Sequence, residues 1–184
     1  MSESYDFTDP EVLTVGAEGL PGQRVFFVQA RQEGRVATLK MEKIQVAALA
    51  AWIAKTLEDL PAPGHLPEDA ELEAVPFLEP AWAVGSLGGD YDAETDRIVL
   101  VAAELTDEDD DETEADPDES GFAFGGHGAT ARFRATREQM AALAIRATRL
   151  VEAGRPPCPL CGYPLDPTSG HQCPRTNGFR PPSL

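Results

Sequence analysis

The chain has 184 residues, 42% of them hydrophobic, and its 15 basic and 32 acidic side chains give a formal net charge of −17. This length can bury a core, whereas no run approaches the roughly 20 apolar residues that a membrane helix needs. The acidity argues against a general nucleic-acid binder, because nonspecific affinity for phosphates comes from clustered Lys and Arg. No basic and then apolar leader opens the chain, so we expect a cytoplasmic protein.

The first predicted unit spans residues 12–60 and reads as three short strands and a helix. The strands are rich in β-branched and aromatic residues and are bounded by turn signals such as Leu20-Pro21-Gly22. Apolar residues then recur at helical spacing until Pro61, where a connector with five prolines begins and runs to Pro80. The predicted helix positions are Val46, Leu49, Ala50, Ile53, Leu57 and Leu60.

A second unit, residues 81–153, repeats this pattern. Gln45-Val46-Ala47-Ala48-Leu49-Ala50 is matched 94 positions later by Gln139-Met140-Ala141-Ala142-Leu143-Ala144. Thr136 stands three residues before Gln139, the spacing of a capping box at a helix start. Because the preceding strands match at an offset of only 73, the second unit contains 21 extra residues.

Those extra residues form an acidic insertion, which we place at 104–126. Eleven Asp or Glu residues and no basic one lie between Glu104 and Glu119, and the rest of the chain carries a charge of −6. Such composition favours a disordered excursion from a hairpin over an arm that binds a basic partner.

These patterns predict an α+β fold in which two βββα pseudo-repeats pack about a pseudo-twofold axis. The duplicated domain is expected to occupy residues 1–154, and a short zinc-binding tail residues 155–184.

All three cysteines lie in that tail. Cys158 and Cys161 form a Cys-x2-Cys turn, and His171 and Cys173 follow after nine residues. Four thiolate or imidazole ligands are the set that a closed, tetrahedral structural Zn²⁺ site uses. Three cysteines cannot pair completely as disulfides, and a cytosolic chain should not need them. We therefore predict a structural zinc ion bound by Cys158, Cys161, His171 and Cys173.

Two other cysteine chemistries fit less well. A zinc deaminase would need an upstream His-x-Glu, which neither His65 nor His127 provides. A redox Cys-x-x-Cys is expected at the start of a helix that follows a strand, whereas prolines flank this one. No phosphate-binding loop or nucleophile motif occurs, so we assign no catalytic residue and favour a non-enzymatic role.

The basic side chains suggest where a partner or ligand could bind. The turn around Gln23 and Arg24 could hold a carboxylate or phosphate, although an arginine there could simply protect a sheet edge. Lys40 with Arg134, and Lys43 with Arg137, occupy matching positions in the two repeats and could flank a cleft. The candidate binding residues are Gln23, Arg24, Arg31, Lys40, Lys43, Arg134, Arg137, Arg155 and Arg175.

The two ends of the chain also resemble a known family. Pro21-Gly22-Gln23-Arg24 with Phe26-Phe27, and the tail Gly154-Arg155-Pro156-Pro157-Cys158-Pro159-Leu160-Cys161-Gly162 with Gly170-His171 and Cys173-Pro174-Arg175, look like the actinobacterial domain of unknown function 3090. That resemblance implies a zinc-ribbon-like C-terminus and no established enzymatic activity. It also implies a shared pathway or complex with neighbours that resemble a phosphatidylinositol kinase and a histidine phosphatase.

Our reading is a cytosolic zinc-binding adaptor or regulatory partner within a protein complex. One alternative is an enzyme or a binder of a phosphorylated metabolite that uses a cleft between the repeats. The other is nucleic-acid recognition by the zinc tail, which the net charge of −17 makes the weakest of the three.

Overall fold

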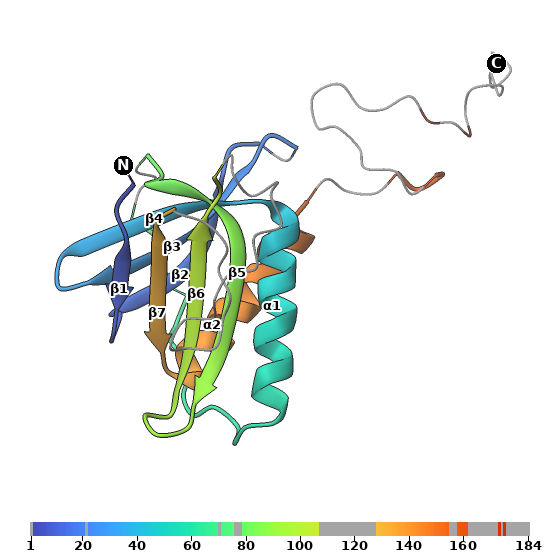
Figure 1. Cartoon of the computed structure of the whole chain (residues 1–184). Coiled ribbons are helices and arrows are strands. Elements are labelled where there is room, and N and C mark those ends of the chain that lie inside the picture. Colours follow the sequence, from blue (N-terminus) through green and yellow to red (C-terminus); the bar gives the residue numbers. More distant parts are fainter. Residues whose placement is uncertain are drawn as a thin grey trace, which may run out of the picture.

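Three strands followed by a helix occur twice along the chain, after one short first strand (Figure 1). The structure is a computed structural model, and it describes residues 2–20, 22–69, 71–75, 79–106, 128–154, 158–161, 173 and 175. The elements are β1 (Tyr5–Phe7), β2 (Val12–Glu18), β3 (Val25–Gln32), β4 (Arg35–Met41), α1 (Lys43–Glu58), β5 (Trp82–Asp92), β6 (Arg97–Glu104), β7 (Thr130–Ala135) and α2 (Arg137–Glu152). The predicted α+β class is confirmed. The predicted acidic insertion falls almost entirely outside the described residues.

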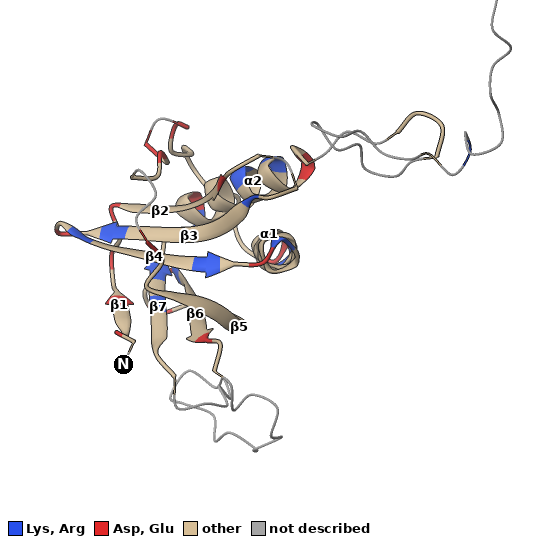
Figure 2. Ribbon diagram, turned by 90° about the horizontal axis from the view of Figure 1, so that it is seen from above, with Lys and Arg blue, Asp and Glu red and all other residues tan. Residues whose placement is uncertain are grey.

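The strands form one seven-stranded sheet in the order β1-β7-β6-β5-β4-β3-β2. Strands β2–β4 form one half of the sheet and β5–β7 the other, and each half is an antiparallel meander. The β3–β4 hairpin turns through Glu33 and Gly34, both at positive φ, as a two-residue hairpin favours. The two halves join by parallel pairing of β4 with β5, and β1 pairs parallel with β7. Strands β2–β4 cross β5–β7 at a steep angle in both views (Figures 1 and 2).

Both helices pack against the same face of this bent sheet and against each other. Alternate strand residues and the apolar stripes of the helices form one core, as their periodicities predict. Leu39 and Phe133 from the two halves, together with Ile53 and Leu143 from the two helices, are fully buried. Phe7 of β1 stacks on Phe133 with ring centroids 5.7 Å apart, which brings the first strand into the same core.

Each helix begins with a capping box whose glutamine also reaches across the molecule. The side-chain oxygens of Gln45 and Gln139 accept from the backbone N–H of Glu42 and Thr136. Their amide nitrogens donate to the opposite half, Gln45 to the Val84 carbonyl at 2.9 Å and Gln139 to the Pro10 carbonyl at 2.7 Å. Each glutamine therefore positions a helix start and joins it to the other half, Gln45 at β5 and Gln139 at Pro10 just before β2.

A buried glutamine fixes the connector between the halves. Gln29 in β3 is 2% exposed; its amide donates to the Thr38 hydroxyl at 2.9 Å, and its carbonyl oxygen accepts from the Val75 backbone N–H at 2.8 Å. A buried amide is stable only when such partners satisfy it. Gln29 thus ties the proline-rich connector to the sheet.

Replacing this glutamine should destabilise the whole domain. Gln29→Met keeps the size of the side chain but leaves the Val75 N–H without its acceptor, and we expect a loss of about 1–3 kcal/mol in the free energy of unfolding. Urea unfolding followed by circular dichroism measures this loss. Gln23→Met, at an exposed turn residue, is the matched control and should change the free energy of unfolding by less than about 0.5 kcal/mol. Equal effects of the two substitutions would contradict this role for Gln29.

Candidate metal centre

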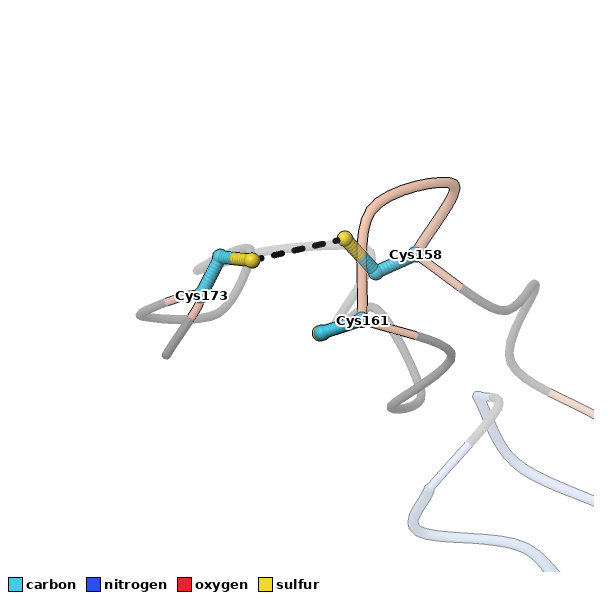
Figure 3. Close-up of side chains that lie close together, drawn as sticks. All are labelled: Cys158, Cys161 and Cys173. Atoms are coloured by element: carbon cyan, nitrogen blue, oxygen red, sulfur yellow. Dashed lines mark hydrogen bonds between the residues drawn. The ribbon is translucent and has the colours of Figure 1, made fainter. Parts of the chain in front are cut away.

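Three cysteines that lie 3 and 12 residues apart in the sequence converge at one point (Figure 3). The sulfur atoms of Cys158, Cys161 and Cys173 all lie within 4.8 Å of one another. The Cys158 and Cys173 sulfur atoms are 3.9 Å apart, within hydrogen-bonding distance, and both residues are 7% exposed. The Cys-x2-Cys turn places the first two thiols side by side, as the sequence predicts, and Cys173 supplies the third thiol.

The local backbone favours the thiolate form of Cys158. The N–H groups of Leu160 and then Cys161 point at its sulfur and, with the neighbouring thiols, lower the pKa of Cys158 below that of an ordinary cysteine. Hydrogen bonds to the charged form of an acid favour that form. Since the thiolate is the form that ligates a metal, this turn is prepared for metal binding.

The spacing of the three thiols suits a tetrahedral metal site. Zinc–sulfur bonds of about 2.3 Å in a tetrahedron place the sulfurs about 3.8 Å apart. The Cys158–Cys173 separation of 3.9 Å agrees with that value. These three cysteines could therefore hold a metal ion with little rearrangement. The predicted fourth ligand, His171, lies outside the described residues.

The structure uses Arg24 and Arg31 within the chain. Arg24 donates through Nη1 to the Ala153 carbonyl at 2.8 Å, and a cation at the C-terminal end of a helix is stabilised by the helix dipole. Arg31 pairs with Glu11 at 3.4 Å. Gln23 beside them is exposed in the β2–β3 turn. Arg24 thus caps the C-terminal end of helix α2, a few residues before Cys158.

The four cations expected to flank a cleft do not form one cluster. Lys40 on β4 and Arg134 on β7 are separated in the sheet by β5 and β6, and Arg134 pairs with Asp6 at 3.1 Å. Lys43 is exposed at the start of α1, with its ammonium close to Gly154. Of the two tail arginines, Arg175 is exposed and Arg155 lies outside the described residues.

Arg137 is the centre of a small polar network that the sequence did not indicate. Its guanidinium pairs with Asp96 at 3.0 Å and donates to the Pro61 carbonyl at 2.5 Å. The Tyr91 hydroxyl donates to the other Asp96 oxygen at 2.8 Å. The Arg137 and Tyr91 hydrogen bonds lower the pKa of Asp96, and the bond to that carboxylate raises the pKa of Tyr91. This network fixes the β5–β6 turn to the start of α2 and to the connector.

A polar cavity of about 270 Å³ lies elsewhere, beside the connector. Its polar lining comes from Glu11, His65, Glu71 and Gln139, and its apolar lining from Leu13, Pro67 and Leu72. Glu11 already pairs with Arg31, and Gln139 with the Pro10 carbonyl. The sequence did not single out this group, because three separate segments contribute to it.

The Asp96 network should make folding stability depend on acid. Its folded-state pKa lies below the unfolded value of about 3.9, so its stabilisation is complete above that value and is lost as the pH falls through the folded pKa. We expect Asp96→Asn to lower the free energy of unfolding at pH 7 and to flatten its decline below about pH 5.

Urea unfolding at a series of pH values measures this effect. Asp69→Asn is the control, since Asp69 pairs with Arg149 on an exposed surface where ion pairs contribute little. Parallel pH profiles for the wild type and Asp96→Asn would show that this network does not set the acid response.

Within the described residues, neither helix is long and apolar enough to cross a membrane. No curated protein and no solved structure matches the chain. A family model described as protein of unknown function DUF3090 matches residues 5–173, a range that includes the helices and strands of the described part of the chain and the three clustered cysteines. The chain is therefore a member of the DUF3090 family.

Proposed function

We propose that this protein is a zinc-binding adaptor, without catalytic activity of its own, that contacts a protein partner in the cytoplasm through its C-terminal module. The observation that carries the proposal is the convergence of the Cys158, Cys161 and Cys173 thiols. His171 is proposed as the fourth ligand. With four protein ligands the coordination sphere is closed, so the ion stabilises the fold of the module and leaves no position for a substrate.

The surface of the cysteine turn supports a docking role. Leu160, between the two cysteines of the turn, is 52% exposed, and Arg175 beside the third cysteine is also exposed. An exposed apolar side chain on the cysteine turn, together with the exposed Arg175 cation of the same module, offers a partner both buried area and charge. The candidate partners are the kinase-like and phosphatase-like neighbours that the family resemblance implies.

The proposal of a phosphorylated ligand receives less support. A phosphate site needs converging cations, yet Arg134 and Arg137 pair with carboxylates of the chain itself and Arg24 binds a helix end. The polar cavity beside the connector contains Glu11 and Glu71, which would repel an anion.

We also propose that the two βββα units are copies related by a pseudo-twofold axis. Supporting it, the two helices begin with the same capping box, and Gln45 and Gln139 make reciprocal contacts with the opposite half. The parallel β4–β5 pairing also corresponds to the β7–β1 pairing. In this arrangement the core is shared between the copies, and the C-terminal module is the part that only the second copy carries.

The metal proposal predicts one zinc ion per chain. Native mass spectrometry of the purified protein should show this ion, and Cys161→Ser or His171→Asn should weaken its retention against a chelator by at least about tenfold. His65→Asn and His127→Asn are matched controls that should retain the metal. Full retention by Cys161→Ser would contradict the proposed ligand set.

The adaptor role predicts that a partner is lost when the module is altered. The tagged protein, isolated from its own cytosol, should retain a specific protein that Cys161→Ser and Leu160→Glu both release. Leu160→Glu is expected to keep its zinc, which separates loss of the contact surface from loss of the metal. A partner held equally by both variants would place the contact outside the zinc module.

A further inference from the structure

The three thiols of the metal centre differ in their access to solvent. Cys158 and Cys173 are each 7% exposed, whereas Cys161 is partly exposed and Leu160 beside it is 52% exposed. The chain has no other cysteine. Oxidation of cysteine depends on how far the thiol is exposed to solvent, so a small oxidant reaches Cys161 before the two buried thiols.

Cys158 is the central sulfur of the cluster. Its sulfur forms hydrogen bonds with the Cys161 and Cys173 thiols, and the backbone N–H groups of Leu160 and Cys161 point at it. All three sulfurs lie within 4.8 Å of one another (Figure 3). A thiol that reacts reversibly with oxidants typically has a second cysteine in reach that can close a disulfide with it. Cys158 occupies that place for Cys161, in the same turn of the chain.

From this arrangement we propose that the cysteine cluster reacts with hydroperoxides, with Cys161 as the oxidised thiol and Cys158 as the thiol that closes a disulfide with it. The consequence for metal binding rests on the proposed function, because the reacting thiols are two of the four ligands proposed for Zn²⁺. After the reaction the site retains Cys173 and the proposed ligand His171, which are too few to hold the ion. Peroxide therefore removes the metal that orders the module and, with it, the surface that contacts the partner.

The reaction has two steps. The Cys161 sulfur attacks one oxygen of hydrogen peroxide, the O–O bond breaks, and hydroxide leaves, so that Cys161 becomes a sulfenic acid. The Cys158 sulfur then attacks the Cys161 sulfur, the S–O bond breaks, and a second hydroxide leaves. The two hydroxides take up the two thiol protons. In sum the two thiols lose two electrons and two protons, and the peroxide is reduced to two water molecules.

The closeness of Cys158 makes this oxidation reversible. Disulfide formation consumes the sulfenic acid before a second peroxide converts it to the sulfinic acid, which thiols do not reduce. A thiol reductant attacks the disulfide and restores both ligands. The module therefore has a reduced state that binds the metal and an oxidised state that does not. One peroxide is consumed for each module, so this is a switch and not the disulfide-exchange catalysis that the flanking prolines disfavour.

Treatment of the full-length, zinc-loaded protein with hydrogen peroxide tests the inference. We expect the mass of the denatured chain to fall by two hydrogen atoms, and peptide mapping to find Cys158 joined to Cys161. A chromogenic chelator should detect about one Zn²⁺ released per chain at the same rate as the change in mass. A thiol reductant followed by Zn²⁺ should restore both the mass and the bound metal.

Two variants with the same substitution separate the roles of the thiols. Cys161→His and Cys173→His each keep a side chain that can ligate Zn²⁺. Cys161→His should slow the change in mass and the zinc release at least about tenfold, whereas Cys173→His should respond like the wild type. Equal responses of the two variants would overturn the inference, as would a wild-type chain that keeps its thiols and its zinc in peroxide. A wild-type chain that binds no zinc yet forms the Cys158–Cys161 disulfide would contradict the proposed function and support the thiol reaction.

Discussion

Two amide side chains hold the halves of this molecule together. Gln45 and Gln139 each accept from the N-cap of their own helix and donate to a carbonyl in the opposite half. A carboxylate in the same position could not do both, because it has no proton to donate. These paired hydrogen bonds fix where each helix starts relative to both halves of the sheet. Leu49, Ile53 and Leu143 of the two helices pack in the shared core.

Local signals in the sequence were sufficient to predict the class of fold and the cysteine cluster. The spacing of Val46, Leu49 and Ile53 predicts a buried helix face, and that of Cys158 and Cys161 predicts thiols at one point; the structure confirms both. Contacts between distant segments could not be predicted in this way. Asp96 is an unremarkable turn residue in the sequence, and the partner that gives it a role, Arg137, lies 41 positions away.

The arginines show the same limit, because their partners within the chain could not be predicted from the sequence. Four of those that the structure describes are committed within the domain: Arg24 to the end of α2, Arg134 to Asp6, Arg137 to Asp96 and Arg146 to β2. In the sequence, Arg24, Arg134 and Arg137 are equally compatible with a surface that binds phosphate and with one that binds a protein partner. Because these four guanidinium groups have partners within the chain, the cysteine turn with its exposed Leu160 is the place that we propose for contact with another molecule.

The two tryptophans of the chain occupy contrasting surroundings. Trp82 is 5% exposed and its indole donates to the Glu3 carbonyl, whereas Trp52 is partly exposed over Gly89, where it lines an apolar groove between α1 and β5. An indole in the interior emits at shorter wavelength than one in contact with water. The intrinsic fluorescence of this protein therefore contains two separable signals. The Trp82 signal reports whether the domain is folded, and the Trp52 signal reports whether the groove along β5 is open to water or covered.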